Sequence, residues 1–173
     1  IPSIPNNVHH WFVVNLMLTP NNKNITAIPF GVAEGKQEGI YEEIESKINE
    51  KPKDNKIYIS WNDYTYERYK LREKMTDWQK KLGAEPITVK VPGEPDPYDK
   101  YLKALSTHKY CISPPGNGAD CYRTLESIYM GCLTLVENTP LNLSTGLPVL
   151  TYKNVDDIIS YYEDNVFDQM AED

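Results

Sequence analysis

The sequence predicts an α/β fold, a three-layer Rossmann-like domain with a mostly parallel sheet. Short runs of β-branched and aromatic residues alternate along the chain with longer segments of helical periodicity, which is the pattern of βαβ units. The stretch KYCISPPGNGADCYRTLESIYMGCLTLVE, residues 109–137, is one complete unit of strand, glycine-rich loop, helix and strand. With 173 residues, 40% of them hydrophobic, residues 1–173 are expected to form a single domain with a core.

The chain opens with two apolar runs. Residues 8–17 suit a first strand, or residues 1–17 form a linker strand from a preceding domain, and residues 25–32 suit a second strand. His9 and His10 are interpreted as strand or linker residues, since neither a carboxylate nor a cysteine stands at metal-ligand spacing.

The elements before the central unit follow from periodicity and from turn residues. Isoleucines that recur every four residues predict an amphipathic helix over 39–51, and the β-branched and aromatic run at 56–60 predicts a strand. A helix is expected from Thr65 to Gly83, then a strand over 85–91 and a short helix over 98–106.

After the central unit, residues 138–146 are rich in Asn, Thr, Ser and Pro and are expected to form a loop. A strand over 147–152 and a final helix over 154–162 complete the alternation.

The glycine-rich loop of the central unit is a candidate anion site. Gly116, Asn117 and Gly118 lead into a helix for which Asp120 is expected to be the N-cap, and such a loop presents backbone N–H groups to an anion. Arg123 in the first turn opposes the helix dipole by about 0.3–1 kcal/mol, and a bound phosphate would reverse that penalty. Glu126 lies one turn further, so a plain Arg123–Glu126 surface pair is the alternative.

A second stretch repeats this arrangement. After the strand that ends near Ser60 come Asn62, Thr65 as the helix cap, and Arg68 in the first turn. Because parallel strands end at one edge of a sheet, Arg68 and Arg123 are expected to grip one diphosphate from two sides. The alternative is that these side chains and the tyrosines beside them only cover a helix end, and Trp61 is either a stacking surface or a core residue.

The motif SPPGNGADCYRTLESIYMGCLTLV resembles the signature of exostosin-like and related GT-B glycosyltransferases. The resemblance implies that this chain is one half of a GT-B fold, the nucleotide-sugar-binding half. It implies that Arg123 contacts the donor diphosphate and that Glu126, with Asp120 nearby, meets the ribose. In such folds the loop after the strand at 85–91 meets the nucleobase, which makes Val89 and Lys90 candidates. Asn62, Thr65 and Arg68 match a further element of these enzymes.

Composition excludes several classes of protein. The formal net charge of −7 argues against a broad nucleic-acid surface, and no apolar run approaches the roughly 20 residues of a membrane span. Three cysteines without metal-type spacing indicate reduced thiols and a cytoplasmic setting, with a lumenal fragment of a membrane-anchored enzyme as the alternative. Cys111 and Cys132 are expected in the core, whereas Cys121 stands at a helix N-terminus and is a weaker candidate nucleophile.

The preferred function is therefore donor binding in a glycosyltransferase that needs neither a metal nor a cofactor, with the nucleotide sugar as substrate. A sugar or protein acceptor and an N-terminal acceptor-binding domain are the implied partners, and the catalytic residue is not identified. The chain alone is expected to bind donor and to transfer sugar poorly. The alternative is a non-catalytic nucleotide or phosphoanion-binding module on the same fold.

Overall fold

The computed structural model describes residues 7–16, 23–33, 39, 42, 53–83, 87–89, 97–144 and 146–164. Its centre is a five-stranded sheet in the order β4-β3-β5-β6-β7, in which every neighbouring pair is parallel. The strands are β3 (Asp54–Ile59), β4 (Ile87–Val89), β5 (His108–Ser113), β6 (Leu133–Glu137) and β7 (Val149–Tyr152). The predicted α/β class with a mostly parallel sheet is confirmed.

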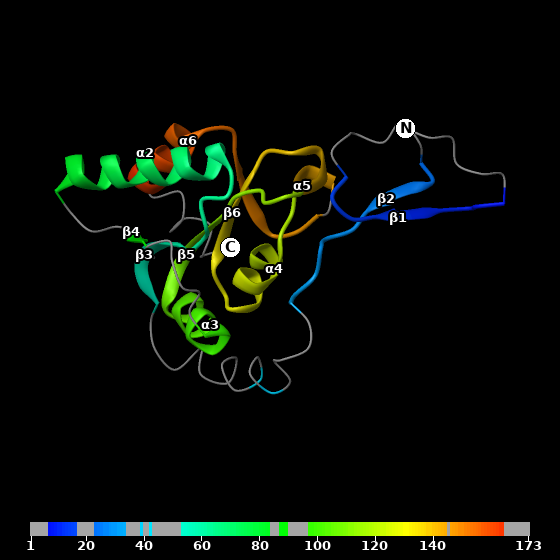
Figure 1. Ribbon diagram of the computed structural model, residues 1–173, viewed down its shortest axis with the longest axis horizontal. Coiled ribbons are helices and arrows are strands. Elements are labelled where there is room, and N and C mark those ends of the chain that lie inside the picture. The colour runs from blue at the N-terminus through cyan, green and yellow to red at the C-terminus, as the bar shows by residue number, and fades with distance from the viewer. Residues whose placement is uncertain are drawn as a thin grey trace.

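Helices cover both faces of this sheet, which gives the predicted three layers (Figure 1). Helices α2 and α6 pack on one face, and α3 and α4 pack on the other. Their bounds are α2 (Tyr66–Leu82), α3 (Tyr98–Thr107), α4 (Tyr122–Tyr129) and α6 (Val155–Glu163).

The core is divided between the two faces by the alternation of side chains along the strands. Ile57 and Ile59 of β3 point into the cluster beneath α2 and α6, where Met75 and Ile158 are fully buried. Tyr58, between them, belongs to the opposite cluster beneath α3 and α4. Strands buried on both faces are typical of a parallel sheet, and they explain why these strands are apolar without alternation in the sequence.

Local signals set the helix ends where the sequence placed them. The Thr65 hydroxyl accepts the Arg68 N–H at 3.3 Å, and Gly83 ends α2 with a left-handed φ of 66°. At the end of α4, Gly131 has φ 71°, its N–H donates to the Ile128 carbonyl at 2.9 Å, and the Cys132 N–H donates to the Ser127 carbonyl at 2.8 Å, which together form a Schellman motif. The expected helix ends at Thr65, Gly83 and Gly131 are confirmed.

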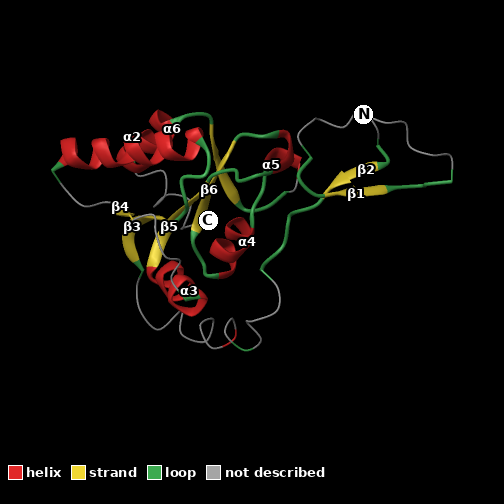
Figure 2. Cartoon of the chain, viewed as in Figure 1, coloured by secondary structure: helices red, strands yellow, loops and turns green. Residues whose placement is uncertain are grey.

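The N-terminal strands form a separate sheet. β1 (Trp11–Val13) and β2 (Ile25–Ala27) pair in parallel and stand to one side of the main domain, as Figure 2 shows. Ala27 packs with Ala119 and with Leu141 of the short helix α5 (Pro140–Ser144), which attaches the small sheet to the domain. Residues 8–17 and 25–32 thus contain strands, as expected, but shorter ones and outside the main sheet.

Two further predictions are not confirmed in full, the helix over 39–51 and the loop over 138–146. Of the helix predicted over 39–51, only residues 39 and 42 are described, so the prediction lies outside the described residues. The loop expected over 138–146 is wrong in part, because α5 occupies its middle. A helix of five residues is too short to show a period in the sequence.

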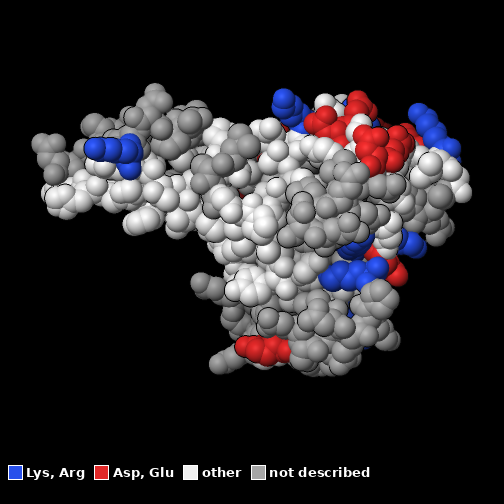
Figure 3. All heavy atoms as spheres, turned by 180° about the vertical axis from the view of Figure 1, so that it is seen from behind, with Lys and Arg blue, Asp and Glu red and all other residues white. Residues whose placement is uncertain are grey.

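The surface carries an uneven charge. Figure 3 shows acidic side chains gathered over α6, whose acids include Asp156, Asp157 and Glu163.

In the described part of the chain, no helix combines the length and apolar character that crossing a membrane requires.

Candidate functional site

The strand order places a topological switch point between β3 and β5. After β3 the chain moves outward to β4, and it then returns through α3 to the other side of β3 as β5. Connections that leave neighbouring strands in opposite directions open a crevice at the carboxyl edge of the sheet, where α/β proteins bind ligands. The N-terminus of α2 and the glycine loop, residues 114–118, both lie at this edge.

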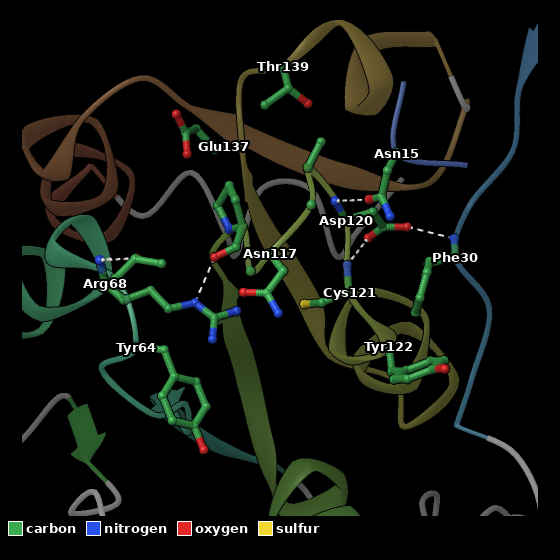
Figure 4. Close-up of a pocket in the computed structure, with 15 residues that line it drawn as sticks. Asn15, Phe30, Tyr64, Arg68, Asn117, Asp120, Cys121, Tyr122, Glu137 and Thr139 are labelled. Carbon is green, nitrogen blue, oxygen red and sulfur yellow. Dashed lines mark hydrogen bonds between the residues drawn. The ribbon is translucent and has the colours of Figure 1, made fainter. Parts of the chain in front are cut away.

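A cavity of 740 Å³, here called the main cavity, occupies this position (Figure 4). Its lining comes from the glycine loop, the start of α4, the start of α2, the end of β6 and the N-terminal segments. Of the predicted site residues it contains Thr65, Arg68, Gly116, Asn117, Gly118 and Asp120. The sequence therefore identified the two stretches that converge on this site.

Arg68 holds the glycine loop from within the protein. Its Nε donates to the Pro115 carbonyl at 2.6 Å and its Nη2 to the Pro114 carbonyl at 3.3 Å, and the side chain is buried. A Cβ on Gly116 would lie 3.0 Å from this guanidinium group, so a small residue at 116 lets Arg68 approach. Burial and, next, the charge of Arg123 hold the pKa of Arg68 below its ordinary value.

The second glycine makes room for a distant side chain. A Cβ on Gly118 would lie 2.5 Å from the side chain of Asn15. Asn15 has a φ of 54°, and its Oδ1 accepts the Asp120 N–H at 2.9 Å. The loop glycine that sequence reasoning assigned to phosphate is thus also required by contact with the N-terminal segment.

Asp120 is not the N-cap of α4, and this expectation is wrong. The helix begins at Tyr122 with Cys121 as its N-cap, and no side chain caps it. The carboxylate of Asp120 instead accepts the Phe30 N–H and the Cys121 N–H, each at 2.8 Å. A partner 90 residues away thus prevails over the local cap pattern, and Asp120 ties the N-terminal segment to the start of α4.

The uncapped start of α4 presents donors without acceptors. In the part of the chain that the structure describes, no acceptor is assigned to the backbone N–H groups of Asn117, Gly118, Ala119, Tyr122 and Arg123. The first turn of α4 also holds no acidic side chain. Its partial positive charge is therefore unopposed, which suits an anion.

Arg123 lies in this first turn of α4, is partly buried and does not line the main cavity. Its Nη1 is 3.7 Å from Cys121 Sγ, and its Nε is buried and has no hydrogen-bond partner among the described residues. Burial acts to lower the pKa of Arg123, but the electrostatic influence of Tyr101 and Cys121 outweighs it, so the pKa is raised. A permanently charged group with an unsatisfied donor is suited to an anionic ligand.

Glu126 does not form the ion pair considered for it. It is 3% exposed, and no ion pair joins it to Arg123, although the structure describes both residues. Its Oε1 accepts the Tyr98 hydroxyl at 2.6 Å, and its Oε2 accepts the Tyr101 hydroxyl at 2.9 Å. Glu126 thus links α4 to α3, and it does not line the main cavity.

The remaining candidates lie outside the main cavity. The Asn62 side chain donates to the Tyr64 hydroxyl at 3.1 Å, and Trp61 is a core residue whose Nε1 donates to the Arg68 carbonyl at 3.2 Å. Val89 ends β4, where its backbone but not its side chain is described, and Lys90 lies outside the described residues.

The cavity also contains residues that sequence reasoning missed. Asn15, Phe30, Tyr122 and Thr139 line it, and the rings of Phe30 and Tyr122 lie 4.7 Å apart on the side opposite Tyr64 (Figure 4). The sequence held no signal for Tyr122 either, which is the first residue of α4 and is 41% exposed. No local pattern connects Asn15 or Phe30 to a glycine loop so much later in the chain.

All three cysteines are free thiols. Cys111 and Cys132 are buried, as expected, and burial raises the pKa of both. Cys121 lines the main cavity, with its Sγ 3.3 Å from Ser113 Oγ. His108 lies at the other end of β5, where its ring contacts Thr88 and Ala104, so it is not a base for Cys121.

No group of three or more His, Cys, Asp or Glu side chains is placed to hold a metal ion within the described residues. No protein-family model matches the sequence, and no curated protein is significantly similar to it. The resemblance to exostosin-like enzymes therefore rests on the motif residues themselves.

Proposed function

We propose that this domain binds a nucleoside diphosphate sugar, as the donor-binding half of a glycosyltransferase of the GT-B type. The diphosphate lies against the glycine loop and the N-terminus of α4, within the main cavity. The chemistry is transfer of the sugar to an acceptor hydroxyl group, without a metal ion. A further domain that binds a sugar or protein acceptor completes the enzyme.

One observation carries the proposal: the start of α4 has no capping side chain and no acid, and it opens on a cavity of 740 Å³. Arg123, in the same turn, does not line that cavity, and its buried Nε has no hydrogen-bond partner among the described residues. A buried donor without a partner costs about 1–3 kcal/mol, and more when it is charged. A phosphate group bound at the start of α4 would accept hydrogen bonds from the free backbone N–H groups there and would oppose the charge of both arginines. The cavity lies within the 300–1,000 Å³ range typical of small-molecule sites.

The same groups would assist the reaction. When the bond between sugar and diphosphate breaks, negative charge grows on the leaving phosphate oxygen. Backbone N–H groups and guanidinium groups that are already in place stabilise such charge without reorganisation. The motif resemblance supports this role for Arg123, and the hydrogen bonds of Arg68 to the loop carbonyls support a positioning role for Arg68.

The second candidate is a non-catalytic nucleotide or phosphoanion module. The hydrogen bonds from Tyr98 and Tyr101 to Glu126 favour this candidate. They satisfy the Glu126 carboxylate within the protein, so it is not available for the ribose contact that the glycosyltransferase resemblance implies. Both candidates predict anion binding, and only the first predicts release of nucleotide from a sugar donor.

The test is a thermal-shift screen of nucleoside diphosphates, their sugars and pyrophosphate, followed by calorimetry of the ligands that bind. A ligand at 100 times its Kd stabilises the folded state by about 2.7 kcal/mol, which such a screen detects readily. We expect nucleoside diphosphates to shift the midpoint and nucleosides to do so much less. If no diphosphate compound shifts the midpoint, both candidates are wrong.

A further inference from the structure

Two carboxylates line the main cavity, and they differ in what they already bind. Both oxygens of Asp120 accept backbone N–H groups, from Phe30 and from Cys121. Within the described part of the chain, no hydrogen bond or ion pair is assigned to the carboxylate of Glu137, whose backbone carbonyl accepts from Asn142 Nδ2 at 2.8 Å. Of these two carboxylates, Glu137 is the one available to a ligand.

Glu137 stands where the main cavity meets a second cavity of 410 Å³. The two cavities share five lining residues, Thr65, Arg68, Pro115, Gly116 and Glu137. The rest of the second cavity is formed by the first turns of α2, by Pro114 and by the corner between β7 and α6. A group bound in the second cavity would therefore approach a ligand of the main cavity past Arg68 and Glu137.

We propose that the second cavity admits the reacting hydroxyl group of the acceptor, whose remainder the further domain holds, and that Glu137 takes the proton of this hydroxyl group, an inference that rests on the proposed function. The acceptor oxygen forms a bond to the anomeric carbon of the donor. The bond from that carbon to the phosphate oxygen breaks, and its electron pair leaves with the diphosphate. The hydroxyl proton moves to the Glu137 carboxylate, so one bond forms and one breaks at the anomeric carbon and the charge is balanced.

The surroundings of Glu137 suit a base. Burial raises the pKa of Glu137, and the neighbouring charge of Glu67 adds to the shift. A base is most effective when its pKa approaches the working pH, so the shift strengthens Glu137 in this role. The titratable groups that line the second cavity with it are Glu67, Arg68, Lys70, Lys74, Tyr152 and Lys153.

The experiment compares Glu137→Gln with the unmodified chain, using the nucleotide sugar that binds best in the screen. Release of nucleoside diphosphate is followed with water and with a panel of simple sugars as acceptors, and donor affinity is measured by calorimetry. Glutamine keeps the shape and can still bind a hydroxyl group, but it cannot take a proton. We expect turnover to fall about 10²–10⁴-fold, the usual contribution of a general base, with donor affinity retained.

The matched control is Glu163→Gln, an exposed acid on α6 that lines neither cavity and contacts Trp78. It should retain full turnover. In the unmodified chain the rate should fall as the pH drops through the pKa of the Glu137 carboxyl group. The residual rate of Glu137→Gln should not show this fall.

Three results would overturn the assignment. Unchanged turnover in Glu137→Gln would remove Glu137 as the base, and an equal loss of donor affinity would make it a donor-sugar contact. A chain that binds donor and releases no nucleotide with any acceptor would place the base outside this chain. Failure of every nucleotide to bind would instead remove the proposed function itself.

Discussion

Helices α2 and α4 begin at the same edge of the sheet, each after a strand and a polar turn and each with an arginine in its first turn. Their N-termini are nevertheless satisfied in different ways. In α2 the Thr65 hydroxyl accepts the Arg68 N–H, and Glu67 places an acid in the first turn. In α4 no side chain caps the helix and no acid stands in the first turn.

The two arginines differ in the same sense. Arg68 gives its Nε and Nη2 to the carbonyls of Pro115 and Pro114, while Arg123 keeps a buried Nε without a partner among the described residues. One arginine is thus an internal support for the glycine loop, and the other keeps a buried donor without a partner. Similar sequence patterns can therefore have different roles, because the partners come from other segments.

The largest effect is expected from Arg68→Ala. The change removes two charged hydrogen bonds and leaves the loop carbonyls of Pro114 and Pro115 without a donor, so we expect the free energy of unfolding to fall by about 2–4 kcal/mol. Urea unfolding followed by circular dichroism measures this. Lys70→Ala, which removes an exposed residue paired with Glu73 on the same helix, is the control and should cost about 0–1 kcal/mol. Equal small losses in both variants would contradict the role of Arg68 as a support.

Arg123→Ala should weaken ligand binding and leave the stability of the free domain unchanged, the opposite of Arg68→Ala. We expect nucleoside diphosphate binding to weaken by about 1.5–3 kcal/mol, the usual contribution of a charged hydrogen bond, while the stability of the free domain stays near its original value. Calorimetry and urea unfolding on the same samples measure the two quantities. Lys80→Ala, near the other end of α2, removes one exposed charge and should change neither. Unchanged affinity in Arg123→Ala would remove α4 as the diphosphate site.

Glu126→Gln tests the residue one turn beyond Arg123. If Glu126 meets the ribose, nucleoside diphosphate binding should weaken by about 1–2 kcal/mol while binding of pyrophosphate, which has no ribose, is retained. Because Glu126 lies outside the main cavity and both its oxygens already accept tyrosine hydroxyls, we expect no such selective loss, only a small loss of stability from the weakened bonds to Tyr98 and Tyr101. Tyr101→Phe removes one of those bonds and leaves the carboxylate, so it is the matched control. A selective loss for nucleoside diphosphate would contradict this expectation and make Glu126 a ribose contact.

The sequence was sufficient where the determining contact is local. Thr65, Gly83 and Gly131 end their helices as predicted, because caps are formed by residues within one turn. Apolar runs and helical periods likewise predicted the strands of the main sheet and its class. The convergence of the two arginine stretches followed from the rule that parallel strands end at one edge.

The sequence was insufficient where a distant segment supplies the partner. Asp120 has the spacing of an N-cap, but the N–H of Phe30 competes for its carboxylate. Glu126 has the spacing of an ion pair with Arg123, but its carboxylate instead accepts hydrogen bonds from two tyrosines of α3. Such contacts depend on how the layers pack, and no periodicity encodes them.

The smallest effect is expected from removal of metal ions. The groups that the start of α4 offers to an anion are backbone N–H donors and the guanidinium group of Arg123, with Arg68 nearby. Magnesium binds chiefly through oxygen ligands, and of the two cavity carboxylates Asp120 already accepts two backbone N–H groups. The positive charge that the diphosphate needs is therefore expected to come from the protein. We expect EDTA to leave the calorimetric affinity for nucleoside diphosphate unchanged, in the unmodified chain and in the Lys80→Ala control alike. If EDTA abolishes binding and magnesium restores it, the difference between the two helix starts is not what creates the site, because a metal ion would then supply the charge that we assign to the start of α4.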